Sequence, residues 1–143
     1  MIKRFVVDNS VVMVWCFEDE TSDYADKVLE SLANTVAIVP AIWTLEVVNT
    51  LLVAERRQRL SESKSAQFIQ LLRTVSIQVV QEPFHHISDD IVTLAREQRL
   101  SSYDAAYLDL AKREAVPLAT LDASLRRAAQ AIQVPLFSVA EQT

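Results

Sequence analysis

Four acidic side chains stand at positions where they could act together. Asp8 and Asp122 each follow a predicted buried strand, Asp104 begins a predicted helix, and Glu46 lies in the first turns of another. Ligands of open parallel sheets bind outside the carboxyl ends of the strands. Three of these acids belong at that edge, and Glu46 lies one helical turn from it. Converging carboxylates repel each other, so they predict a compensating cation, and oxygen ligands without thiolates favour Mg²⁺ or Mn²⁺.

Each acid also has a purely structural interpretation. Asp104 could complete a capping box with Ser101, Asp122 could be a helix N-cap, and Asp8 could form a turn. Glu46 could be an ordinary surface acid, although its predicted helix has no broad solvated face and a carboxylate there needs a cation or a donor. Capping and metal binding are compatible, because helix N-termini favour anionic groups. Position alone therefore indicates a divalent-metal carboxylate site without excluding the structural roles.

Apolar runs and amphipathic stretches alternate along the chain and predict the elements that position these acids. The predicted strands are residues 3–8, 36–39, 76–80, 116–120 and 134–139. The predicted helices are residues 10–17, 21–34, 41–59, 61–75, 88–99, 105–113 and 123–132, with Ser61 as a cap and residues 101–104 opening the helix at 105. Strands that alternate with helices predict an α/β domain with a mostly parallel sheet of about five strands.

Composition restricts the possible classes of protein. The 143 residues suit one domain, and a net charge of −5 argues against a general nucleic-acid binder, so contacts with nucleic acid must be local or metal-assisted. The absence of glycine excludes a P-loop, a Rossmann fingerprint and a serine nucleophile elbow. The single cysteine, Cys16, excludes an internal disulfide, and Asp8 interrupts the apolar run that a signal peptide would need. We therefore expect a cytoplasmic protein.

Four segments together resemble a PIN domain, and most closely the VapC-type toxins of prokaryotic toxin–antitoxin pairs. These segments are VVDNS at 6–10, PAIWTLEVVNTL at 40–51, SYDAAYL at 102–108 and LATLD at 118–122. The resemblance covers essentially the whole chain, in order and at the expected spacing. It implies a single three-layer α/β/α PIN domain over residues 1–143. The usual glycine before the last strand is absent, which we interpret as a loop difference.

The resemblance also implies a site and an activity. Metal-binding acids are implied at Asp8, Glu46, Asp104 and Asp122, with small polar helpers at Ser10, Asn49 and Thr120. The implied activity is that of a Mg²⁺- or Mn²⁺-dependent endoribonuclease toxin, in which metal-assisted attack of water hydrolyses an RNA phosphodiester. The implied partners are a second copy in a homodimer and a cognate antitoxin, a segment of which occupies the groove and places an Arg or another group in the acidic site.

Other activities stay open. One alternative is a PIN nuclease that acts in RNA maturation, and another is a non-catalytic PIN-like module that binds RNA or protein. A haloacid-dehalogenase-type phosphatase would need an aspartate where Ser10 stands, and a receiver domain would need a late lysine that residues 116–122 lack.

The remaining polar and apolar groups have weaker interpretations. RNA phosphates could contact Arg56, Arg57, Arg59, Arg126 and Arg127, or these could be solvated helix faces. We expect His85 and His86 to be ordinary surface residues, and Tyr103 and Tyr107 to serve in packing. The apolar stretches 11–17 and 41–53 could form an interface or a buried core.

Overall fold

Four parallel strands form the sheet of the computed structural model, which describes residues 2–139. The strands are β1 (Lys3–Val7), β2 (Thr35–Pro40), β3 (Ile77–Val80) and β4 (Leu118–Ala119), in the order β3-β2-β1-β4. The central strand β1 pairs with β2 from Lys3↔Thr35 to Val6↔Ile38, and with β4 at Val6↔Leu118 and Val7↔Ala119. The α/β class is confirmed. The expected fifth strand is reduced to one isolated parallel bridge, Leu118↔Leu136.

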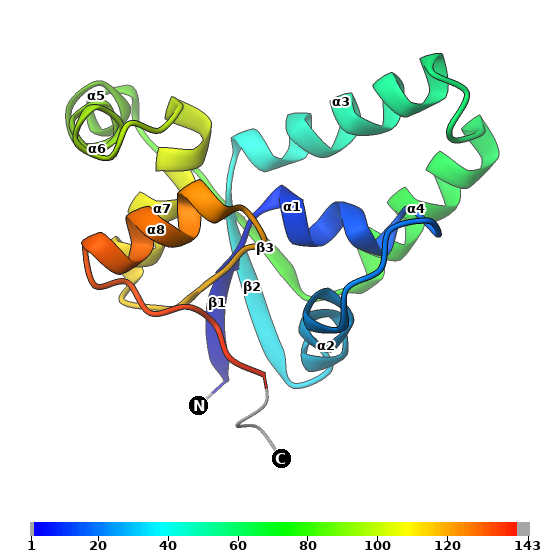
Figure 1. Ribbon diagram of the computed structural model, residues 1–143, viewed down its shortest axis with the longest axis horizontal. Coiled ribbons are helices and arrows are strands. Elements are labelled where there is room, and N and C mark those ends of the chain that lie inside the picture. The colour runs from blue at the N-terminus through cyan, green and yellow to red at the C-terminus, as the bar shows by residue number, and fades with distance from the viewer. Residues whose placement is uncertain (1, 140–143) are drawn as a thin grey trace.

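Helices lie on both sides of this sheet. They are α1 (Asn9–Val12), α2 (Asp23–Ser31), α3 (Ile42–Arg56), α4 (Glu62–Thr74), α5 (Phe84–His86), α6 (Val92–Gln98), α7 (Ser102–Glu114) and α8 (Ala123–Ala131). A 3₁₀ turn, Met13–Trp15, follows α1, and a π-helical turn, Ile87–Ile91, joins α5 to α6. In Figure 1, α7 and α8 lie on one side of the sheet and α1 and α2 on the other.

Side-chain caps define where several helices begin. Ser22, Ser61, Ser101 and Asp122 each accept a hydrogen bond from a backbone N–H in the first turn of the following helix. Without glycine, the helix C-termini adopt left-handed backbone at other residues. Arg99 has φ 55° after α6, and Ala115 has φ 54° after α7. These positions carry a steric cost that glycine would avoid.

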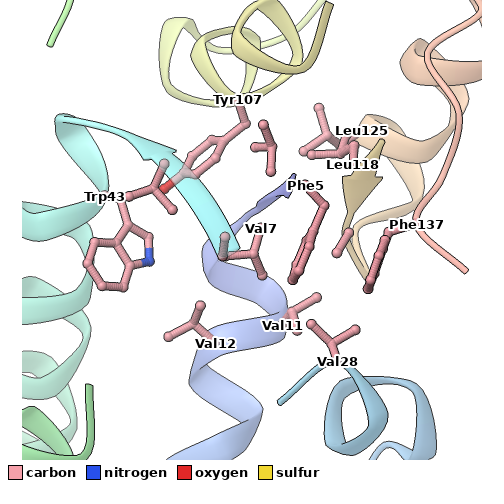
Figure 2. Close-up of a cluster of buried hydrophobic side chains, with 14 of the residues drawn as sticks. Phe5, Val7, Val11, Val12, Val28, Trp43, Tyr107, Leu118, Leu125 and Phe137 are labelled. Carbon is pink, nitrogen blue, oxygen red and sulfur yellow. The ribbon is translucent and has the colours of Figure 1, made fainter. Parts of the chain in front are cut away.

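The core lies against both faces of β1. Phe5, Val6 and Val7 are fully buried, and the Phe5 ring stacks on Phe137 with centroids 4.0 Å apart. Figure 2 shows Val11 near this pair. A strand packed on both faces is rigid, because close-packed interiors leave little free volume. The residue that follows β1 therefore has a fixed position.

The two apolar stretches differ in their burial. Within residues 11–17, Val11, Val12 and Phe17 belong to the core of the chain itself. In contrast, α3 buries one face and exposes Leu45 and Val48, which are 67% and 43% accessible. The buried-core interpretation therefore holds for the first stretch and fails for part of the second.

Candidate active site

Asp8 is held by two hydroxyl groups at the end of β1. It is only 4% exposed, and both of its carboxylate oxygens accept hydrogen bonds. The Ser10 hydroxyl donates to Oδ1 over 2.5 Å, and the Thr120 hydroxyl donates to Oδ2 over 2.7 Å. The backbone N–H of Ser10 also donates to Oδ1, at 3.2 Å, so that Asp8 is the N-cap of α1. The carboxylate is therefore fixed in orientation by groups from two neighbouring strand ends.

The same two hydroxyls tie the loop after β1 to the loop after β4. The Ser10 hydroxyl oxygen accepts from the backbone N–H of Leu121 at 2.9 Å, and the Thr120 oxygen accepts from the N–H of Asp122 at 3.0 Å. Each hydroxyl has one donor and is able to accept as well, so both roles are satisfied at once. The chain thereby positions Asp122 relative to Asp8.

Asp104 interacts electrostatically with each of the other three acids. Burial raises the pKa of Asp8 to about 6, the Ser10 and Thr120 hydrogen bonds oppose that rise, and the Asp104 charge adds to it. Burial also raises the pKa of Glu46, and the Asp104 charge raises it further. The pKa of Asp104 itself is raised by burial and by the charge of Asp122. Asp104 is thus near enough to interact with each of the other three carboxylates.

Tyr107 contributes a contact that the sequence analysis missed. Its hydroxyl donates to Oε1 of Glu46 over 2.6 Å, and its side chain is only 1% exposed. Figure 2 shows the ring reaching from α7 toward α3, which carries Trp43. The prediction of a packing role is incomplete, because Tyr107 also holds a carboxylate. A signal was present in the sequence: Tyr107 follows Asp104 by three residues, which places both on one face of a helix.

Asp104 and Asp122 also have the capping roles that were considered as alternatives. The backbone N–H of Asp104 donates to the Ser101 hydroxyl at 3.1 Å, which is one half of a capping box. Oδ1 of Asp122 accepts from the backbone N–H groups of Ser124 and Leu125 at the start of α8. Capping employs only one oxygen of Asp122, so it leaves the other available.

The donor set fits a hard divalent cation. The four acids supply only oxygen, and Ser10 and Thr120 add hydroxyl oxygens nearby, which is the chemistry that Mg²⁺ and Mn²⁺ prefer. None of the ion pairs within residues 2–139 involves one of the four acids. In the same part of the chain, no group of three His, Cys, Asp or Glu side chains is arranged to hold an ion. Within the described residues, the four carboxylates are thus neighbours without a basic partner, and their side chains do not converge closely enough to surround an ion.

Asn49 does not join this cluster. Its side chain is exposed on α3, and no hydrogen bond within the described residues links it to an acid. The next residue, Thr50, contacts the start of α1 instead: its hydroxyl accepts from Nδ2 of Asn9 at 3.3 Å and donates to the backbone carbonyl of Glu46 at 2.9 Å. The structure therefore places Thr50, rather than Asn49, between α3 and the loop that carries Asp8.

Of the five arginines that could contact RNA phosphates, two make contacts within the chain. Arg59 pairs with Asp19 and Glu20 and lies over the Phe17 ring. The guanidinium of Arg126 lies 5.8 Å from the centroid of the Tyr24 ring. The other three, Arg56, Arg57 and Arg127, are exposed.

The prediction that both histidines are ordinary surface residues is wrong for His86. Its side chain is 12% exposed, with Nε2 2.7 Å from Oδ2 of Asp109 and Nδ1 2.9 Å from Oδ2 of Asp90. Arg113 pairs with the same Asp109 and with Glu82. The hydrogen bond with Asp109 is the main cause that raises the pKa of His86, and the charges of Asp109 and Asp90 add to it. This network links α5 and the π-helical turn to α7, separately from the four acids.

Comparison with known proteins identifies the family. The model of the PIN domain family matches residues 5–131. The chain belongs to the PIN domain family. No curated protein sequence matches this PIN domain.

Solved structures agree on the fold of this PIN domain. PAE2754 from Pyrobaculum aerophilum is similar over 90% of this chain and 86% of its own, with 21% identity and a TM-score of 0.69. FitAcB from Neisseria gonorrhoeae is similar over 96% and 99%, with 18% identity and a TM-score of 0.65. VapC20 from Mycobacterium tuberculosis, a toxin that cleaves the sarcin–ricin loop, is similar over 87% and 94%, with 12% identity and a TM-score of 0.61. Within residues 2–139, no helix of this PIN domain is long and apolar enough to cross a membrane.

Proposed function

We propose that this PIN domain is a metal-dependent endoribonuclease toxin that hydrolyses RNA phosphodiester bonds and is neutralised by a cognate antitoxin. The observation that carries the proposal is the cluster at the carboxyl edge of the sheet, where Asp104 interacts electrostatically with Asp8, Glu46 and Asp122. PIN domains are generally nucleases. The similarity to VapC20, a toxin that cleaves the sarcin–ricin loop, supports RNA as the substrate. We expect this enzyme to act in the cytoplasm.

The residues have distinct roles in this proposal. A bound Mg²⁺ or Mn²⁺ would activate water and neutralise charge on the scissile phosphate. Asp8 and Asp104 would hold the ion, with Glu46 and Asp122 completing the site. Ser10 and Thr120 orient Asp8 by donating to its two oxygens. Positioning of this kind matters, because mutation of the groups that orient metal ligands commonly lowers metal affinity or activity by about 10- to 100-fold.

Tyr107 has the same role toward Glu46. Its hydrogen bond favours the ionised carboxylate, and so it opposes the rise that burial imposes on the Glu46 pKa. Burial of the ring keeps that hydroxyl aligned. The ionised form of Glu46 is the one that can contribute to a cation site, so Tyr107 helps to keep the fourth acid competent.

An exposed apolar face on α3 supports the proposal that this PIN domain binds protein partners. Leu45, Val48 and Leu52 are 67%, 43% and 44% exposed and follow one another at helical spacing along α3. Contiguous exposed apolar surface of this kind marks interaction sites. Structures similar to this one include a toxin–antitoxin complex from Klebsiella pneumoniae and VapBC2 from Rickettsia felis. We assign α3 to partner binding, with an antitoxin and a second copy in a homodimer as the partners.

Cleavage of RNA in the presence and absence of metal tests the activity. We expect purified protein to cleave a labelled RNA mixture with Mg²⁺ or Mn²⁺, EDTA to abolish cleavage, and Asp8→Asn to remove it without unfolding. Asp26→Asn, which changes an exposed acid on α2, is the matched control and should cleave normally. An Asp8→Asn protein that cleaves as well as the unmodified protein would contradict the site. RNA binding without cleavage of any RNA would favour a non-catalytic module.

Expression in a bacterial host tests the toxin part. A toxin should arrest growth, and Asp8→Asn should relieve the arrest. Metal-dependent cleavage without growth arrest would instead favour a nuclease of RNA maturation.

A further inference from the structure

A hollow lies at the same sheet edge as the four acids. It is a cavity of about 310 Å³ at the carboxyl ends of β2 and β3, between the starts of α3 and α7 and the π-helical turn. Its walls include Ile42, Gln81 and Tyr103. In the sheet order β3-β2-β1-β4, β2 adjoins β1, whose end carries Asp8. The cavity and the acids therefore occupy adjacent parts of one sheet edge.

Two helices contribute to both places. On α3, Ile42 lines the cavity and Glu46 follows four residues later, about 6 Å along the helix axis. On α7, Tyr103 lines the cavity and Asp104 is the next residue. A chain of nucleotides with one phosphate at the acids would therefore bring a neighbouring nucleotide to the cavity.

The lining of the cavity suits a neutral, flat group. Most of the wall is apolar, from residues such as Pro40, Ile42 and Ile91, and the Gln81 amide adds hydrogen-bonding capacity. The only charged residue that lines it is Glu82, which pairs with Arg113. A phosphate would find no basic side chain among these lining residues. A base, in contrast, presents apolar faces for packing and polar edges for an amide.

Tyr103 supplies a stacking partner for such a group. Its side chain is 55% exposed, although it lines the cavity. Exposed aromatic rings bind unpaired bases by stacking, whereas bases in a duplex are already stacked on each other. An exposed ring next to a metal-site acid is therefore better suited to a single-stranded segment than to a duplex.

We propose that this cavity is a subsite for one unpaired nucleobase of the RNA, next to the phosphodiester that is cleaved. Tyr103 stacks on the base and Gln81 reads its edge. The inference rests on the proposed ribonuclease function, and it adds the place on the protein where one base beside the cut is bound and read.

Variants of the two named residues test this subsite. The probe is a pool of single-stranded RNA with a randomised segment, cleaved with Mn²⁺ and sequenced at the cut ends. Tyr103→Ala should raise KM about 10-fold with a much smaller change in kcat, since stacking on an aromatic ring contributes about that factor per base. Tyr103→Phe keeps the ring and should keep KM. Gln81→Ala should weaken the base preference at the one position. Leu71→Ala, which truncates an exposed apolar residue on α4, is the remote control and should change neither quantity.

Binding of the same pool in EDTA gives a readout that does not depend on catalysis. Fluorescence anisotropy should show about 10-fold weaker binding for Tyr103→Ala and unchanged binding for Tyr103→Phe. Equal affinities, KM values and base preferences for Tyr103→Ala and the unmodified protein would overturn the subsite. A change in oligomeric mass with unchanged RNA binding would also overturn it, because the cavity would then belong to an interface between copies. If no RNA is cleaved but Tyr103→Ala still weakens binding, the proposed catalysis fails while the subsite stands.

Discussion

Asp8→Asn should stabilise the metal-free protein at neutral pH while it removes activity. The folded-state pKa of Asp8 is about 6, compared with an ordinary value of 3.8. A raised pKa means that the folded state binds the proton more tightly than the unfolded state does. The free energy of unfolding therefore falls as pH rises from about 4 to about 6, and the full penalty, about 3 kcal/mol, persists above that range.

Asparagine avoids this penalty because it cannot ionise. One contact is lost in return: the Thr120 hydroxyl donates to Oδ2 of Asp8, and an amide nitrogen at that place cannot accept. Losing one such hydrogen bond costs about 1 kcal/mol. We therefore expect Asp8→Asn to raise the free energy of unfolding by about 2 kcal/mol at pH 7.5 and to lower it, or leave it unchanged, at pH 4.

Urea denaturation in EDTA at the two pH values measures this difference. EDTA matters, because a bound cation would stabilise the ionised aspartate and reverse the order of the two proteins. The matched variant Asp26→Asn changes an exposed acid and should shift stability by less than about 0.5 kcal/mol at both pH values. An Asp8→Asn protein that is less stable than the unmodified one at pH 7.5 would refute the claim that burial of the ionised Asp8 carboxylate destabilises the metal-free fold.

Three further substitutions have definite expected outcomes. Tyr107→Phe keeps the ring in the core but removes the donor to Glu46, so kcat should fall about 10-fold and the acidic limb of the pH–rate profile should move to higher pH, as measured by RNA cleavage. His86→Gln should lower the free energy of unfolding more at pH 5.5 than at pH 8.5. The raised pKa of His86 gives a stabilisation that is present below its unfolded-state pKa and is lost as pH rises through its folded-state pKa. Equal losses in urea denaturation at both pH values would contradict the pairing with Asp109. Ala115→Gly should raise the free energy of unfolding by about 1 kcal/mol, because glycine adopts φ 54° without steric cost, and a thermal melt that moves down would show that the strain is absent.

Local sequence patterns predicted the elements that depend on local chemistry. The alternation of apolar runs with amphipathic stretches located the four strands, and the serine before the helix at Glu62 correctly predicted its start at Ser61. The last predicted strand failed for a tertiary reason. Leu136 makes one bridge with Leu118, and the chain then directs Phe137 onto Phe5, so side-chain stacking takes the place of a longer ladder.

The sequence predicted the site residues whose role follows from their position along a strand or helix. It predicted less well the residues whose role depends on a partner far away in the sequence. The strand end that carries Asp8 was evident from the residue pattern, whereas the expectation that Ser10 assists it came from the resemblance to PIN domains. On the long helix, however, Asn49 and Thr50 are adjacent polar residues, and the sequence could not show which of them faces α1; the structure places Thr50 there. His86 was misjudged because its partner Asp109 lies 23 residues away on another helix.

The proposed metal site depends most directly on Asp104, whose charge raises the pKa of both Asp8 and Glu46. The decisive measurement is the rate of RNA cleavage during a Mn²⁺ titration, with metal binding followed by calorimetry on the same samples. We predict that the unmodified protein gains activity in step with Mn²⁺ binding, and that Asp104→Asn binds Mn²⁺ at least about 10-fold more weakly and cleaves at least about 100-fold more slowly. Cleavage by Asp104→Asn at the unmodified rate, or cleavage that EDTA does not affect, would contradict a carboxylate-held metal as the basis of the activity.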